Sequence, residues 1–170
     1  MMTTCESIHL LKQMLSIPSL SRNEESKASF LQAYLQQMGC EKVNRVGNNV
    51  YTYAYEYDAK KPTILLNSHI DTVKPNENWT YAPFQATQVG DSIYGLGAND
   101  AHASVVSLIA AFDYLRSTRQ NYNLILGISC EEEVSGKNGV ECMLQSLPAI
   151  DLAIVGEPTG LEMAVADRKS

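Results

Sequence analysis

The sequence predicts an α/β fold, a mostly parallel mixed sheet with helices on both faces. Short apolar runs at residues 64–66, 123–129 and 152–155 have the length and composition of strands covered on both faces. Segments with apolar residues at helical spacing lie before, between and after them. Strands that alternate with helices over such short distances favour a mostly parallel sheet.

Composition limits the kinds of protein this chain can be. Its 170 residues are the length of one domain, and 45% hydrophobic with 19% charged residues can build a core. No apolar run is long enough to span a bilayer, so we expect no membrane association. The formal net charge of -6 argues against a nucleic-acid partner and suits a cleft that binds cations.

The N-terminus and the cysteines favour a cytoplasmic protein. The first residues lack the basic segment and apolar core of a secretory signal. Cysteines 5, 40, 130 and 142 have no Cys-x-x-Cys spacing, so we expect neither a zinc knuckle nor a redox pair, but reduced thiols.

The first forty residues predict two helices. Ile8, Leu11 and Leu15 are spaced for a helix that ends before Pro18. Ser21 and Glu24 have the spacing of a capping box, which predicts that a second helix starts there and ends near residue 39.

The middle of the chain predicts a strand, a hairpin and a third helix. Tyrosines alternate with smaller residues over 49–57, which indicates a strand face rather than a ligand site. Gly90 and Asp91 lie at the turn of a hairpin. A helical stripe follows it at Val105, Leu108, Ile109, Phe112 and Leu115, and a shorter helix is predicted at residues 140–147.

Polar ligands follow the predicted strands. His69 and Asp71 lie at the carboxyl end of the first covered strand, where alternate residues point to one side and open α/β sheets bind ligands. A histidine that is merely paired with a neighbouring aspartate near the surface is the alternative for these two residues alone.

Acidic residues recur in the same kind of position. Glu131, Glu132 and Glu133 follow residues 123–129, Asp100 lies at a glycine-bearing turn, and Glu157 follows the last strand. Three adjacent carboxylates repel one another and are costly to bury without a cation, although a solvated acidic turn remains the alternative. Histidine and carboxylates together suit zinc or a similar divalent ion, so we expect a two-metal hydrolytic centre.

Four segments carry a family resemblance that covers nearly the whole chain. They are Asn67-Ser-His-Ile-Asp71, Tyr94-Gly-Leu-Gly-Ala-Asn-Asp100, Glu131-Glu-Glu-Val-Ser-Gly136 and Gly156-Glu-Pro-Thr159. Together they resemble the zinc-dependent amidohydrolases and exopeptidases, a family that includes acetylornithine deacetylase, succinyl-diaminopimelate desuccinylase, aminoacylase and glutamate carboxypeptidases. The residues of these motifs are most similar to those of the acetylornithine deacetylase branch.

The resemblance implies a role for each of these residues. His69 and Glu157 would bind the first of two divalent ions, zinc or alternatively cobalt, and Asp100 would bridge both. Glu133 would bind the second ion. Glu132 would be the general base and Asp71 would orient His69, which leaves Glu131 without a role.

The resemblance also implies that residues 1–170 are the N-terminal part of a catalytic domain. The lid or dimerisation domain, the C-terminal part of the catalytic domain and the last histidine ligand would then lie beyond Ser170. We expect the fragment alone to be inactive and the whole protein to form a homodimer.

Two further expectations concern the turn at Asp100. The resemblance implies a cis peptide bond between Asp100 and Ala101. His102 differs from the small or basic residue of many relatives, and we expect it to face solvent at a helix start, with a contact to substrate or metal as the alternative.

The expected activity is hydrolysis of the amide bond of an N-acyl amino acid. N-acetyl-L-ornithine leads, with N-succinylornithine as a close analogue, which would place the enzyme in arginine biosynthesis. The alternatives are a dipeptidase or carboxypeptidase of the same family and a non-catalytic metal-binding fragment. Glu132 beside Glu133 argues against the last, because a structural site needs no base.

Overall fold

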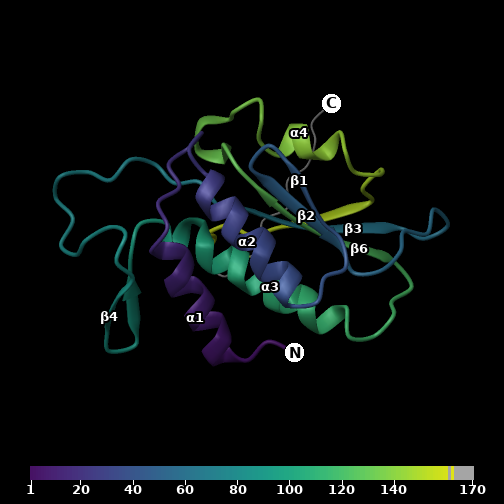
Figure 1. The fold of residues 1–170 in the computed structure, drawn as a ribbon, viewed down its shortest axis with the longest axis horizontal. Coiled ribbons are helices and arrows are strands. Elements are labelled where there is room, and N and C mark those ends of the chain that lie inside the picture. Colours follow the sequence, from purple (N-terminus) through teal and green to yellow (C-terminus); the bar gives the residue numbers. More distant parts are fainter. Residues whose placement is uncertain (161, 163–170) are drawn as a thin grey trace.

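A five-stranded mixed sheet in the order β1-β2-β6-β3-β7 forms the centre of the computed structural model (Figure 1). The structure describes residues 1–160 and residue 162. The strands in sheet order are β1 (Val43–Val46), β2 (Asn49–Tyr53), β6 (Asn123–Ser129), β3 (Thr63–His69) and β7 (Leu152–Val155). Strands β6, β3 and β7 are parallel, whereas β1 and β2 add antiparallel pairs at one edge. The predicted α/β class is confirmed.

Helices cover both faces of this sheet. Helices α1 (Thr4–Leu15), α2 (Glu25–Gln37) and α3 (Ala103–Leu115) lie together on one face, and the short α4 (Val140–Leu144) lies on the other (Figure 1). Single helical turns, η1 (Ala98–His102) and η2 (Glu132–Val134), precede α3 and follow β6. The hairpin β4 (Thr87–Val89) and β5 (Ser92–Tyr94) stands apart from the sheet (Figure 1). None of the helices in the described residues is long and apolar enough to cross a membrane.

The main core lies between the sheet and the three long helices. Alternate residues of the central strands, including Leu66 and Leu126, point into it and meet Ile109 and Phe112 of α3. Burying each such side chain stabilises the fold by roughly 1.5–3 kcal/mol. This core fixes β3 and β6 side by side and therefore fixes the residues at their carboxyl ends.

Strand β3 is buried along most of its length, as its apolar sequence predicts, and it is paired on both sides. Its register aligns His69 with Ser129 of β6 and Asn67 with Val155 of β7. The three carboxyl ends therefore open at one edge of the sheet.

Strand β7 differs from the prediction. Leu152, Ile154 and Val155 are 53%, 49% and 55% exposed, and β7 is the edge of the described sheet. The expectation of a covered strand is wrong for this part of the chain. The apolar sequence correctly predicts a strand, but the burial of that strand depends on what packs against it.

The N-terminal helices also differ in detail. The side chains that α1 buries are Leu10, Met14 and Leu15, whereas Ile8 is 42% exposed. The capping box in this region belongs to Thr3 and Glu6 at the start of α1.

Ser21 and Glu24 do not form the predicted capping box. Helix α2 starts at Glu25 without a side-chain cap. The Glu24 carboxylate is buried and accepts hydrogen bonds from Arg22 N and Asn48 Nδ2. The Ser21 hydroxyl donates instead to Asp71, 2.8 Å away. Both side chains that local spacing assigns to a helix end therefore make tertiary contacts instead, Ser21 with Asp71 and Glu24 with Asn48.

The first two strands differ from the prediction. Strand β2 ends at Tyr53, although the alternation continues to Tyr57. Strand β1 was not predicted, because its four half-buried residues show no apolar alternation.

Candidate metal centre

His69 lies at the last position of β3 with its ring almost completely buried. Its Nδ1 is 3.1 Å from the backbone oxygen of Asp71 and 3.4 Å from Asp71 Oδ1. These contacts fix the ring and leave Nε2 facing the open edge of the sheet, as is usual for a histidine that binds a metal.

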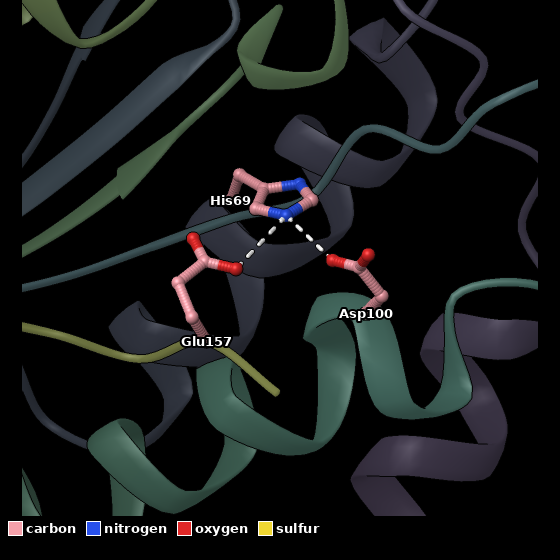
Figure 2. A group of neighbouring side chains, drawn as sticks. All are labelled: His69, Asp100 and Glu157. Carbon is pink, nitrogen blue, oxygen red and sulfur yellow. Dashed lines mark hydrogen bonds and ion pairs between the residues drawn. The ribbon is translucent and has the colours of Figure 1, made fainter. Parts of the chain in front are cut away.

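Two carboxylates from other segments approach this nitrogen. Asp100 Oδ1 lies 3.1 Å and Glu157 Oε2 lies 3.8 Å from His69 Nε2 (Figure 2). The possible ligand atoms of the three residues all lie within 4.8 Å of one another. The structure thus brings together one residue at the end of β3, one in the turn before α3 and one after β7.

The chemistry of these donors fits a divalent metal ion. One imidazole nitrogen and two carboxylates form a ligand set that zinc and similar ions accept. Burial raises the pKa of Glu157 and of Glu133, and the charges of Asp100 and neighbouring glutamates raise both further. Burial lowers the pKa of His69, but the hydrogen bond and charge of Asp71, with Glu157 and Glu132, raise it to about 9. A bound cation would offset this excess of negative charge.

Asp71 is buried behind His69 and contacts several segments of the site. Its carboxylate accepts hydrogen bonds from Ser21 Oγ at 2.8 Å, Glu132 N at 3.0 Å and Glu133 N at 3.1 Å. Burial would raise the pKa of Asp71, but hydrogen bonds from His69, Ser21 and the two backbone amides hold it below its usual value. One carboxylate therefore positions both the histidine and the acidic turn.

The three glutamates after β6 lie in different directions. Glu132 Oε2 is 3.8 Å from His69 Nε2, and its side chain is half exposed. Glu133 is outside the group of three but close enough for Asp100 and His69 to affect its pKa.

Glu131 is turned away from the cluster, with a left-handed backbone (φ 53°). It is buried, and its carboxylate accepts a hydrogen bond from Asn138 Nδ2 at 2.8 Å. A Cβ at Gly136 would lie 1.9 Å from Glu131 Oε2, so a glycine is needed there. The preceding Cys130 is also buried, and burial followed by the charges of Glu24, Glu131 and Asp71 raises the pKa of its thiol to about 12.

Of the two expectations for the turn before α3, one is confirmed and one is wrong. The peptide bond between Asp100 and Ala101 is cis, as predicted. His102 does not face solvent but is fully buried, with Nε2 3.1 Å from the backbone oxygen of Ile70 and 2.9 Å from Lys27 Nζ. The expectation was wrong because the turn directs this ring under the strand end instead of along the helix surface.

A cavity of about 510 Å³ begins at the candidate metal centre. His69, Glu132 and Glu157 line one end, and Leu65 and Val155 line its apolar part beside β7. The candidate ligands therefore border a space that can admit a small organic molecule.

Sequence reasoning missed two residues beside this site. Ser21 was assigned to a helix cap, and Lys27 was not singled out. A signal for Lys27 exists, since it continues the buried stripe of Leu31 and Leu35 at a spacing of four.

The chain is similar to known proteins over most of its length. Residues 65–169, more than half of the chain, match the family described as Peptidase family M20/M25/M40. A succinyl-diaminopimelate desuccinylase of Blochmanniella floridana is 32% identical over 164 residues, which are 89% of this chain and 43% of that protein. The Peptidase M20 domain-containing protein C757.05c of Schizosaccharomyces pombe is 34% identical and covers 95% of this chain and 40% of its own.

A solved structure shows the same fold. The M20 family metallo-carboxypeptidase Sso-CP2 from Sulfolobus solfataricus superposes with a TM-score of 0.69 at 28% identity, over 88% of this chain and 37% of that one. The chain thus spans less than half the length of each of these relatives. The desuccinylase match supports the family but not the acetylornithine deacetylase branch that the motif wording favoured.

Proposed function

Because the chain belongs to peptidase family M20/M25/M40, we propose that residues 1–170 are the N-terminal part of the catalytic domain of a metal-dependent amide hydrolase. The observation that carries this proposal is the convergence of His69, Asp100 and Glu157, with Glu132 beside them. A carboxylate that is half exposed next to a ligand cluster can exchange protons with a substrate, which a purely structural site does not need.

The residues divide between metal binding and proton transfer. His69, Asp100 and Glu157 would hold one divalent ion, and Asp100 with Glu133 would hold a second together with a ligand beyond Ser170. When bound, such ions polarise a carbonyl and make water a better nucleophile at neutral pH. Zinc is the proposed ion and cobalt the alternative.

Glu132 would act as the general base. It would take a proton from the water that attacks the amide carbonyl and return it to the leaving nitrogen, so that one carboxylate serves both steps. Its backbone amide donates to Asp71, which keeps the turn in place while the half-exposed carboxylate remains free to reach the reacting atoms. Asp71 would keep His69 oriented with Nε2 toward the ion.

An N-acyl amino acid is the proposed substrate, and the acyl group is the main choice to be tested. The desuccinylase relative supports a succinyl group, as in succinyl-diaminopimelate, while the motif wording supports N-acetylornithine or N-succinylornithine. The metallo-carboxypeptidase neighbour supports a peptide substrate as the second candidate. Assays of the whole protein on acyl-ornithines, succinyl-diaminopimelate and dipeptides distinguish these substrates.

Since all four cysteines are free thiols, we propose the cytoplasm as the location of the protein.

Two substitutions in the whole protein test the division of roles. Glu132→Gln should lower kcat by roughly 10²–10⁴-fold, the usual contribution of a general base, and leave the zinc content nearly unchanged. Glu133→Gln should lower zinc content as well as activity. Zinc content is measured after dialysis and activity with the substrates above.

Glu141→Gln is the matched control, because Glu141 is an exposed glutamate of α4 away from the cluster. Glu131→Gln does not serve, since Glu131 is buried and hydrogen-bonded. Equal zinc loss from the Glu132 and Glu133 substitutions would contradict the assigned roles.

A further inference from the structure

Lys27 is a buried lysine behind the metal centre. It projects from α2, is 1% exposed, and its Nζ lies 2.9 Å from His102 Nε2. In the described part of the chain, no carboxylate lies within ion-pair distance of it. Burial lowers the pKa of its amine to about 7, although the charge of Asp71 acts in the opposite direction. Burying an amine is costly, and an apolar residue would fill the same place more cheaply.

His102 connects this amine to the two segments that carry ligands. The imidazole follows Asp100 by two residues, and its Nε2 lies 3.1 Å from the backbone oxygen of Ile70, between His69 and Asp71. Ser19 Oγ already donates to this oxygen at 2.6 Å. The Ile70 carbonyl therefore has a donor, and the lone pair on Nε2 can accept a hydrogen bond from Lys27.

The ring has little freedom to move. A Cβ at Gly97 would lie 2.6 Å from His102 Cε1 and 2.7 Å from His102 Nδ1, so the ring packs directly against the glycine backbone. Nδ1 itself is buried and has no hydrogen-bond partner among the described residues. The hydrogen bond that Nε2 accepts from Lys27 is thus the polar contact that holds the imidazole on its other side, where the ring lies against the Ile70 carbonyl.

We propose that Lys27 is a positioning residue of the metal centre, which acts through His102 to hold the turn carrying Asp100 against the strand end carrying His69. The inference rests on the metal binding proposed above. A bridging carboxylate and a histidine must keep their relative position within a fraction of an ångström to share an ion. Lys27 holds the His102 ring, which lies between the turn and the Ile70 carbonyl of the strand end, and can supply that constraint without contacting the ion.

Lys27→Met tests this role, because methionine keeps the length and burial of the side chain but removes the amine. We expect the affinity of the whole protein for Zn²⁺ to fall by about tenfold, the low end for residues that support metal ligands. Affinity is measured by competition with a chromophoric chelator. The thermal midpoint of the metal-free protein should not fall, since an apolar side chain suits this buried position.

Two further variants separate positioning from general effects. Lys137→Met removes the same charge from an exposed position in the loop after the acidic triplet and should leave zinc affinity unchanged. The double variant Lys27→Met with His102→Lys restores an amine where the two side chains now meet, from which it can donate to the Ile70 oxygen. It should recover most of the lost affinity.

Each outcome bears on the proposal. Wild-type zinc affinity in Lys27→Met would overturn it. So would a loss of affinity that is matched by a lower thermal midpoint and not recovered by the double variant, because Lys27 would then be only structural. If the wild-type protein binds no zinc, the proposed function fails and this inference fails with it.

Discussion

The strands on the two sides of β3 lead into one candidate site but differ in burial. Both β6 and β7 run parallel to β3, and each is followed by carboxylates of the candidate metal centre. All seven residues of β6 are buried, whereas all four residues of β7 are exposed. Similar apolar strand sequences thus give the candidate site one side that is packed within the fold and one side that is exposed.

The supporting contacts follow the same division. On the β6 side, the Asp71 carboxylate fixes the backbone of Glu132 and Glu133 and is itself held by Ser21. On the β7 side, the backbone of Gly156 is tied to Asn67 and Ser68, but the Glu157 carboxylate has no hydrogen bond among the described residues apart from its approach to His69. We infer that the β6 side is preformed, whereas the β7 side has less support among the described residues.

The largest expected difference concerns two leucines on either side of Ile64. Leu124 of β6 and Leu152 of β7 both pair with this residue, but they are 3% and 53% exposed. Leu124→Ala should lower the free energy of unfolding by about 3 kcal/mol, since it leaves a cavity in the core. Leu152→Ala should change it by less than about 1 kcal/mol. Urea unfolding measures both, and equal losses would mean that chain outside the described residues covers β7.

A smaller contrast, with opposite signs, is expected between two acidic residues. Asp71→Asn should destabilise the metal-free protein by about 2 kcal/mol, because it replaces the charged acceptor of three hydrogen bonds by a neutral amide. Glu157→Gln should be neutral or slightly stabilising, since burial and neighbouring charges raise the pKa of Glu157 and its ionised form is already unfavourable. Thermal unfolding without metal measures both effects. A destabilising Glu157→Gln substitution would show that the β7 side is as well supported as the β6 side.

The smallest expected effect is the coupling of metal binding to protons. The raised pKa of His69, about 9, means that the ring is charged at pH 7 in the metal-free protein. This charge stabilises the metal-free fold fully below the unfolded value near 6.5, and the stabilisation is lost as the pH rises through 9. Zinc must displace that proton, so apparent affinity should rise by up to about 1.4 kcal/mol per pH unit between pH 7 and 8.

Calorimetry in buffers with different ionisation enthalpies counts the protons released. Asp71→Asn should reduce the count, because Asp71 supplies the hydrogen bond and charge that raise the pKa of His69. An unchanged count in this variant would show that the β6 side does not control the histidine.

Much of the fold could be predicted because it depends on local patterns. The apolar runs at residues 123–129 and 152–155 coincide with β6 and β7, the run at 64–66 lies within β3, and α3 and the β4–β5 hairpin also lie where the sequence predicts them. Periodicity reports which residues share a face, and the core between β3, β6 and α3 follows from it. Burial of β7 could not be predicted, because it depends on a neighbour and not on Leu152 or Ile154 themselves.

The surroundings of the site were harder to predict. The strand pattern led to His69 and Glu157, and the glycine-bearing turn together with the family resemblance led to Asp100, while the roles of all three stay predictions. Ser21 has the spacing of a helix cap, yet its hydroxyl meets Asp71, which is fifty residues away. Contacts over such separations leave no trace in local spacing. The burial of His102 and Lys27 likewise arises from the packing of α2 against the turn before α3.

The buried thiol of Cys130 makes the preformed side of the site observable in time. Alkylating reagents attack a thiolate, and a thiol whose pKa is about 12 inside the fold reacts only when the turn opens to water. The rate at which Cys130 is alkylated therefore reports how often the acidic turn that follows it opens. The exposed Cys5 of the same molecule provides the rate of an unprotected thiol, against which that rate can be read.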